Sequence, residues 1–363
     1  MTPQYDLRLP DKTVAIIYAG GAGTRLWPYS SKECPKQINP VFSKKTLLVD
    51  AFERTVRVIP KENIIVIVTE YIKKQTKDLL PIDESQIIVQ PETIDTAGAM
   101  GLAALIAETR FPDSVVLTVY ADIAVQEPAA YVHAIRQAIA YVRETGHCLT
   151  IGTKPIFPST QLGYIQTGKT IASDKVMFAH KFIEKPDLKL AMSLVKDSTY
   201  LWNTGIYIWK PSKLLHLFKI HAPVIYSGLI ELRASIFSAD FQDKCTLWHT
   251  SVPRTSFEKI ISEHTKEIYV FKADFGWRDI GNWSAVYDVF PKSSDGNVML
   301  GQTDMHIVSI ESSGCLIAPK HRSVALVGVK DLIVIETDDE LLICNRAETA
   351  KVKLAVKKLD EII

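Results

Sequence analysis

The sequence has few cysteines and no spacing that would join them in a disulfide framework or a zinc site. The five cysteines are Cys34, Cys148, Cys245, Cys315 and Cys344. Their number is odd, and no pair has the C-x-x-C spacing of metal and redox motifs. Scattered reduced thiols are typical of the cytosol, and the start of the chain, MTPQYDLRLPDKT, lacks the apolar core of a secretory signal. We therefore expect a cytoplasmic location.

The chain also lacks a strong net charge and a long apolar run. Its formal net charge is +1, which gives no overall field for nucleic acid or an anionic membrane. The longest apolar runs have the length of a strand, well short of the roughly 20 residues that a membrane helix needs. With 363 residues, of which 47% are hydrophobic, the chain can bury one large core or two. These values predict a globular protein with no nucleic-acid or membrane partner.

A glycine-rich loop follows the first apolar run, Val14–Ala19, which reads as a buried strand. The glycines of the loop are Gly20, Gly21 and Gly23. Such glycines let a backbone approach a ligand closely and turn its N–H groups toward an anion, although a simple tight turn is an alternative interpretation. Leu26 stands where a dinucleotide fingerprint has its third glycine, and the P-loop pattern is absent. The loop therefore belongs to neither of these nucleotide-binding motifs.

Apolar runs and helical patterns alternate over roughly the first two hundred residues, which predicts βαβα order and a mainly parallel sheet covered on both faces. Ligands of such sheets lie beyond the carboxyl ends of the strands, where the glycine loop and Asp122 are placed. The turn-rich segment Lys292–Asn297 marks our predicted boundary between domains 1–291 and 292–363. Beyond it, apolar runs recur about every eight or nine residues, which favours a small all-β unit, either a barrel or a β-helix, before a closing amphipathic helix.

The loop and several later segments together resemble one enzyme family. Gly20–Pro28 and Pro35–Gln37 stand in the places of the signature G-G-x-G-T-R-L-x-P…P-K of the sugar-phosphate nucleotidylyltransferases. Trp27 and Gln37 are similar to the mannose-1-phosphate guanylyltransferase branch in particular. The resemblance extends over about residues 12–360 through six or seven motifs in the same order. It implies a Rossmann-like nucleotidyltransferase domain with a mostly parallel mixed sheet and a small β-helix-like C-terminal domain that ends in a helix.

The resemblance also implies a function for individual residues. It implies phosphate contacts and catalysis for Arg25, Lys36 and Lys185. It implies nucleotide binding for Ala19, Gly20, Gly21, Gly23, Thr24, Pro91, Thr96 and Ala97. It implies sugar binding for Gly163, Glu184 and Asn203. Glu258 stands at the place of a family aspartate and is a lesser candidate for the site. It implies Mg²⁺ ligation by Asp122 and Asp279, and carboxylates are the ligands that Mg²⁺ takes from proteins.

The reaction implied is transfer of a nucleotidyl group from GTP to mannose 1-phosphate, which gives GDP-mannose and pyrophosphate. A sugar 1-phosphate is mostly a dianion at neutral pH, so it needs alignment and charge neutralisation more than a general base. The chain departs from the family pattern at Ile123, Asp95 and Leu162. These departures leave two alternatives open, another nucleotide and sugar phosphate pair, or a non-catalytic regulator that binds a nucleotide sugar. The C-terminal β unit and helix are a candidate homodimer interface.

Overall fold

The computed structural model describes residues 12–21, 23–31, 34–40, 45–90, 96–172, 174–300 and 306–361. Contacts between residues group the chain into two compact units. The first unit comprises Met1–Gly20, Ala51–Ala121 and Val125–Trp277, and the second comprises Gly21–Asp50, Asp122–Ala124 and Arg278–Ile363. These units differ from the predicted division at residue 292, because the glycine loop and two short later segments group with the C-terminal part. The domains 1–291 and 292–363 stay a prediction.

The first unit is built on a mixed sheet of nine strands among the described residues. In sheet order they are β3 (Ile87–Gln90), β2 (Ile64–Thr69), β1 (Thr13–Ala19), β4 (Val115–Tyr120), β9 (Tyr200–Trp209), β6 (Cys148–Thr153), β10 (Ile268–Lys272), β8 (Val176–Ile183) and β7 (Tyr164–Ala172). The first four are parallel to one another, and β10 is parallel to β6. The strands β9, β8 and β7 run antiparallel to their neighbours. This confirms the expected mixed Rossmann-like sheet.

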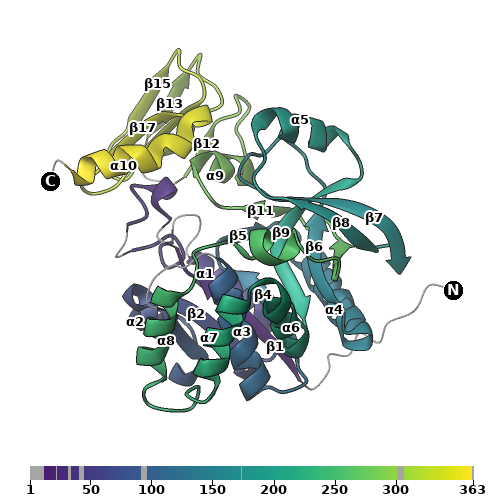
Figure 1. The fold of residues 1–363 in the computed structure, drawn as a ribbon. Coiled ribbons are helices and arrows are strands. Elements are labelled where there is room, and N and C mark those ends of the chain that lie inside the picture. The colour runs from purple at the N-terminus through teal and green to yellow at the C-terminus, as the bar shows by residue number, and fades with distance from the viewer. Residues whose placement is uncertain are drawn as a thin grey trace. The chain divides into compact units, whose positions relative to one another are not determined.

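The central strand β1 is buried at every position, because helices cover both faces of this sheet. The helices of the first unit are α1 (Leu47–Val56, which begins in the second unit), α2 (Lys73–Leu79), α3 (Thr96–Arg110), α4 (Pro128–Thr145), α5 (Leu188–Lys196), α6 (Pro211–His221), α7 (Pro223–Arg233) and α8 (Phe241–Ser251). Figure 1 shows α3, α6, α7 and α8 side by side over the β2, β1 and β4 region. Their apolar residues form one core with alternate residues of β1, namely Val14, Ile16 and Tyr18. The central helix α3 is buried along most of its length, which explains why its sequence is apolar on all sides.

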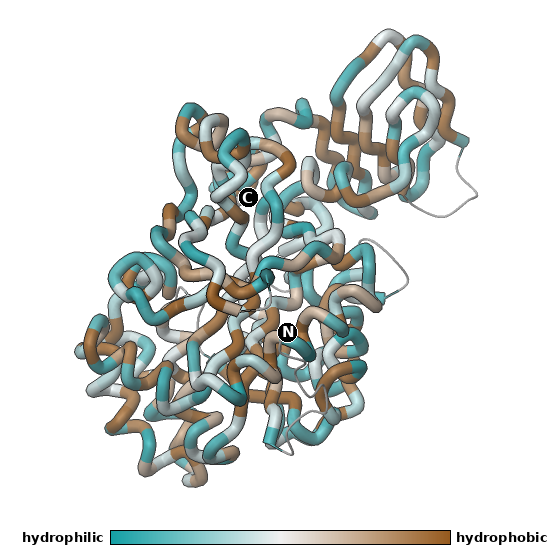
Figure 2. Tube along the Cα trace, turned by 90° about the vertical axis from the view of Figure 1, so that its right-hand side faces the viewer, coloured by the Kyte–Doolittle hydropathy of each residue, from teal (hydrophilic) through white to brown (hydrophobic). Residues whose placement is uncertain are grey.

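The second unit contains the glycine loop and a stack of short strands. These elements are β12 (Val298–Met299), β13 (Ile307–Ile310), β14 (Leu316–Ala318), β15 (Val324–Val327), β16 (Leu332–Glu336), β17 (Leu341–Asn345), α9 (Trp283–Val289) and α10 (Val352–Asp360). Val298 is in parallel register with Leu316, Leu316 with Ile333, and Ile307 with Val324, so a coil takes 17 or 18 residues. Successive coils that stack in parallel form a β-helix and not a barrel, which settles the alternative that the sequence left open. Figure 2 shows hydrophobic residues gathered along these strands.

Among the places where the chain passes from one unit to the other are two short strands, β5 (Ile123–Val125) and β11 (Trp277–Asp279). Each carries a predicted site residue at or next to its end, Asp122 before β5 and Asp279 at the end of β11. Within the part of the chain that is described, none of the helices has both the length and the apolar character needed to cross a membrane.

Candidate functional site

The glycine loop has the backbone geometry that its glycines predict. Ala19 and Gly20 stand at the carboxyl end of β1, and Gly21 and Gly23 have φ of 97° and 61°. This left-handed region is accessible to glycine at little cost. Gly23 precedes a single 3₁₀ turn, Thr24–Leu26, and its carbonyl accepts hydrogen bonds from the Leu26 N–H (2.8 Å) and the Ser30 hydroxyl (2.6 Å). The loop therefore folds back on itself, and its predicted members are placed next to one another.

Lys36 runs along the backbone of Gly23 to a predicted metal ligand. A Cβ on Gly23 would lie 2.9 Å from Lys36 Cγ, so only glycine leaves room for this side chain. The Lys36 ammonium lies 2.8 Å from Asp122 Oδ2 and donates to the carbonyl of Ile280 at 2.9 Å. The side chain of Lys36 is 8% exposed, and that of Asp122 is 26% exposed. A buried cation next to a partly open carboxylate is an arrangement suited to phosphate and metal.

Arg25 and Asp279 lie close to one another in the same unit. A Cβ on Gly281 would lie 2.5 Å from Asp279 Oδ2 and 3.8 Å from Arg25 Nη2, so both side chains pack against this glycine. The backbone N–H of Ile280 donates to the carbonyl of Asp122 at 3.0 Å, which brings the segments of the two aspartates together. The second unit therefore contains four of the five predicted phosphate and metal residues, Arg25, Lys36, Asp122 and Asp279, whereas Lys185 lies in the first unit.

The donor set of this cluster fits a hard divalent ion. Among the described residues no group of three or more His, Cys, Asp or Glu side chains could hold a metal on its own. Mg²⁺ is usually bound by one or two protein carboxylates, with substrate phosphates and water completing its octahedron. Two aspartates beside an arginine and a lysine meet that requirement, whereas a zinc or calcium cage does not fit.

The predicted sugar-binding residues come together in the first unit. A Cβ on Gly163 would lie 2.7 Å from Glu184 Oε2 and 3.6 Å from Asn203 Cβ, and the Asn203 N–H donates to the Gly163 carbonyl at 2.9 Å. Glu184 is 10% exposed and pairs with Lys185 at 2.8 Å. Lys185 has a φ of 47°, which is uncommon for a non-glycine residue and occurs preferentially at functional sites. Three residues that are distant in sequence thus surround one small position.

Asn203 uses all of its hydrogen-bonding capacity within the protein. Its Oδ1 accepts from the Thr150 hydroxyl at 2.9 Å and from the Gly205 N–H at 3.3 Å. Its Nδ2 donates to the Tyr207 hydroxyl at 3.2 Å and to Glu258 Oε1 at 3.3 Å. An amide side chain has two donors and two acceptor positions, so a sugar hydroxyl must replace one of these partners. Thr150 and Tyr207 were not among the predicted residues.

Glu258 is a buried carboxylate in this network. Burial raises its pKa above the ordinary value of 4.5, and the negative charge of Glu184 raises it further. Burial and the charge of Glu258 also raise the pKa of Tyr207 well above its ordinary value, so the tyrosine hydroxyl keeps its proton and donates to Glu258. The candidacy of Glu258 thus rests on more than a motif position.

Thr96 and Ala97, predicted to bind nucleotide, are the first residues of α3. The Thr96 hydroxyl accepts from the N–H of Phe257 at 2.9 Å, and the Ala97 N–H donates to the carbonyl of Thr255 at 3.2 Å. Pro91 and the departure at Asp95 lie outside the described residues. Of the other two departures, Ile123 is buried, and Leu162 precedes Gly163 in the sugar cluster.

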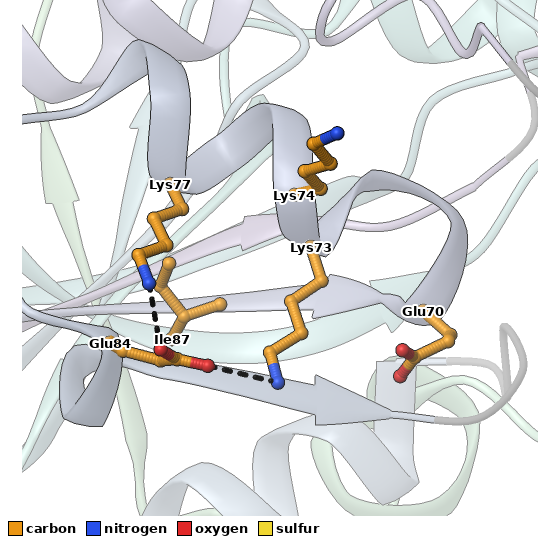
Figure 3. A pocket seen from close by; sticks show the side chains of 6 residues that line it. All are labelled: Glu70, Lys73, Lys74, Lys77, Glu84 and Ile87. Carbon is orange, nitrogen blue, oxygen red and sulfur yellow. Dashed lines mark hydrogen bonds and ion pairs between the residues drawn. The ribbon is translucent and has the colours of Figure 1, made fainter.

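A hollow of the first unit contains none of the predicted residues. Its lining residues are Glu70, Lys73, Lys74, Lys77, Glu84 and Ile87 (Figure 3). Lys73 and Lys77 both pair with Glu84, at 3.3 and 2.9 Å, and all three side chains are exposed. Exposed pairs of this kind contribute little stability. We assign no function to this hollow.

Comparison with known proteins gives the same architecture and function class. The Nucleotidyl transferase family matches residues 14–227, and the MannoseP isomerase/GMP-like beta-helix domain matches residues 305–359. A mannose-1-phosphate guanylyltransferase of Escherichia coli is 32% identical over 360 residues, which cover 96% of this chain and 75% of that protein. One from Klebsiella pneumoniae is 31% identical over 356 residues, covering 95% and 74%. A crystal structure from Thermus thermophilus, described as a mannose-1-phosphate geranyltransferase, has a TM-score of 0.84 at 29% identity and covers 96% of this chain and 99% of that one.

Proposed function

Because the chain belongs to the mannose-1-phosphate guanylyltransferase family of nucleotidyl transferases, we propose that it transfers a guanylyl group from GTP to mannose 1-phosphate. The observation that carries this proposal is the presence of two residue clusters. One combines cations with carboxylates, and its members are Arg25, Lys36, Asp122 and Asp279. The other has groups suited to sugar hydroxyls, and its members are Gly163, Glu184 and Asn203. The similarity to the mannose-1-phosphate guanylyltransferase of Escherichia coli, over 96% of this chain, supports the same assignment.

The chemistry is an in-line displacement at phosphorus. An oxygen of the sugar phosphate forms a bond to the α-phosphorus of GTP, and the bond from that phosphorus to the bridging oxygen of pyrophosphate breaks. The attacking group is mostly a dianion at neutral pH, so no residue has to remove a proton from it. The protein must instead align two polyanions and neutralise the charge that gathers on the leaving pyrophosphate.

Arg25 and Lys36 supply the positive charge in this proposal. Arginine presents a planar fork to phosphate oxygens, and lysine acts as a point charge. Lys36 is held by Asp122 and the Ile280 carbonyl, so its ammonium group is already fixed before substrate arrives. A fixed cation does not have to lose its freedom of movement during the reaction, which favours the transition state.

Nucleotidyltransferases of this family generally use a divalent metal ion. We assign Mg²⁺ to Asp122 and Asp279, the two aspartates of the cluster that fits a hard cation. When bound there, the ion supplies positive charge to the triphosphate oxygens. Asp279 and Arg25 both approach Gly281, so a side chain at that position would meet both of them.

Lys185, Glu184 and Asn203 recognise the sugar phosphate in this proposal. Lys185 contacts the phosphate, and the carboxylate and amide orient the hydroxyls by hydrogen bonds of fixed direction. Gly163 leaves room for the carboxylate of Glu184, because a Cβ at this position would lie 2.7 Å from Glu184 Oε2. The loop and the start of α3 complete the set as nucleotide contacts. The proposed partners are therefore two small molecules, GTP and mannose 1-phosphate. We also propose that the protein is cytoplasmic and forms a homodimer, and native mass spectrometry tests the homodimer.

Pyrophosphate release tests the proposal directly. GTP, ATP, UTP and dTTP are each combined with mannose 1-phosphate and with glucose 1-phosphate, in the presence of Mg²⁺. We expect turnover with GTP and mannose 1-phosphate alone. Turnover with another pair would keep the reaction type and change the substrates, whereas a protein that binds GTP and turns over no pair would refute catalysis and favour the regulatory alternative.

A matched variant controls for contaminating activity. Asp279→Ala removes one proposed metal ligand, and it should abolish turnover while leaving the circular dichroism spectrum unchanged. Full activity of this variant would remove Asp279 from the metal site.

A further inference from the structure

Glu258 contacts both Asn203, which is predicted to bind the sugar, and Thr96 at the start of α3, which is predicted to bind the nucleotide. It is the first residue of a π-helical turn, Glu258–Ser262, a rare conformation that is frequent at functional sites. Its Oε1 accepts from Asn203 Nδ2 at 3.3 Å and from the Tyr207 hydroxyl at 3.2 Å. Its Oε2 accepts from the Thr96 hydroxyl at 3.4 Å. The two carboxylate oxygens therefore face different parts of the site.

The segment before Glu258 strengthens the connection to α3. Thr96 donates to Glu258 and at the same time accepts from the N–H of Phe257 at 2.9 Å. The Ala97 N–H adds a bond to the Thr255 carbonyl at 3.2 Å. Residues 255–258 thus hold the first turn of α3 through three hydrogen bonds, and Glu258 extends this contact to Asn203.

A charged group at this position is costly to bury, which makes its presence informative. A buried carboxylate is tolerated where its oxygens accept hydrogen bonds. The three partners named above all donate, and an ionised carboxylate can only accept, so the network matches the charged form. Because Glu258 accepts from Asn203, it also fixes the orientation of that amide, with Nδ2 toward Glu258 and Oδ1 toward Thr150.

We infer that Glu258 is a positioning residue that couples the nucleotide-binding start of α3 to the sugar-binding Asn203, so that the two substrates are oriented by one carboxylate. This inference rests on the proposed function for the identity of the two ligands. It assigns Glu258 no direct contact with either substrate. Its effect is exerted through Thr96 on one side and through Asn203 on the other.

Steady-state kinetics with a matched control test the coupling. Glu258→Gln keeps the volume of the side chain, but its single oxygen can accept from Asn203 or from Thr96 and not from both. Glu258→Asp keeps the charge and is one methylene too short to reach both. We expect each variant to raise KM for GTP and KM for mannose 1-phosphate together, by about tenfold each. The control Thr150→Val breaks a bond to Asn203 from the opposite side, and it should raise KM for mannose 1-phosphate only.

A second measurement needs no ligand and no turnover. Hydrogen–deuterium exchange of the free protein should show faster exchange in Glu258→Gln at both residues 97–100 and residues 203–206, and in Thr150→Val at residues 203–206 alone. Absence of turnover in the wild type would refute the proposed reaction while leaving this test of the connection intact. The inference is overturned if Glu258→Gln changes one KM alone, if it lowers kcat with both KM values unchanged, or if faster exchange stays on one side of Glu258.

Discussion

Replacement of Gly163 by alanine should separate catalysis from stability. The new methyl carbon would lie 2.7 Å from Glu184 Oε2, whereas carbon and oxygen atoms of neighbouring groups lie about 3.3 Å apart or more. The carboxylate therefore has to move by roughly 0.6 Å. Glu184 Oε2 is the end of a flexible side chain, and no positive φ is required at Gly163, so this movement costs little folding free energy.

The same movement should lower the rate of the reaction. A misplacement of about 1 Å in a catalytic arrangement costs roughly 100-fold in rate, so about 0.6 Å should cost about tenfold, or about 1.4 kcal/mol of transition-state binding. We expect kcat/KM for mannose 1-phosphate to fall by about that factor. The dissociation constant for GTP, measured by calorimetry, should stay unchanged.

Gly168→Ala is the matched control, because Gly168 lies on β7, which begins directly after Gly163, and its added Cβ would be 3.4 Å from the nearest atom, Phe178 Cβ. This variant should retain wild-type kinetics. Equal kcat/KM in Gly163→Ala and Gly168→Ala would refute the reasoning that Glu184 must stay where Gly163 allows it. A loss of thermal stability in Gly163→Ala large enough to explain its rate would refute it as well.

Three further predictions concern single residues. Lys185→Ala should raise KM for mannose 1-phosphate and leave KM for GTP unchanged, and an unchanged KM for the sugar phosphate would contradict its phosphate contact. Ile333→Ala removes a fully buried side chain from the core of the β-helix and should lower the free energy of unfolding by about 2–5 kcal/mol in urea titrations; a loss below about 1 kcal/mol would argue against tight packing there. In the folded protein, burial and the charge of Glu184 raise the pKa of Glu258, and Lys185 lowers it. Because the folded pKa is raised, protonation of Glu258 stabilises the folded state. This stabilisation is complete below pH 4.5 and is lost as the pH rises through the folded pKa. The stability of the wild type relative to Glu258→Gln should therefore fall between acidic and neutral pH, and a difference in urea midpoints that is constant with pH would contradict the raised pKa.

Much of the fold could be predicted from periodicity. Two of the apolar runs that alternate with helical patterns in the first part of the sequence, Ile64–Val68 and Val115–Val119, correspond to β2 and β4, and the apolar stretch Ala97–Thr109 lies within α3. The helix α8 was not predicted, although its buried residues Phe241, Cys245, Trp248 and His249 follow helical spacing. Two of these four are a histidine and a cysteine, so the apolar pattern is weak when only aliphatic residues are counted.

The candidate site was predicted more from motifs than from chemistry. Arg25, Lys36 and Asp122 were chosen because they stand in a long pattern, and each by itself would read as an ordinary surface or turn residue. The roles assigned to them remain proposals. Thr150 and Tyr207 are hydrogen-bond partners of Asn203, and no motif pointed to them. Each lies within a strand whose sequence shows only the pattern of a sheet. Glu258 was a lesser candidate by its motif position alone, because its burial is invisible in the polar segment around it.

The sequence by itself determined which elements form, since strand and helix periods, glycine positions and capping are local properties of neighbouring residues. It also determined the family, because a run of fixed letters such as Gly20–Pro28 survives without reference to distant contacts. Only the tertiary structure decided that Gly163, Glu184 and Asn203 surround one position, and that Lys36 contacts Asp122. It alone decided that the C-terminal strands β12–β16 stack in parallel coils, whereas β17 pairs antiparallel with β16. The physical reason is that strand pairing and the hydrogen bonds of buried side chains depend on groups far apart in the chain. A local sequence pattern does not indicate which distant donor meets which acceptor.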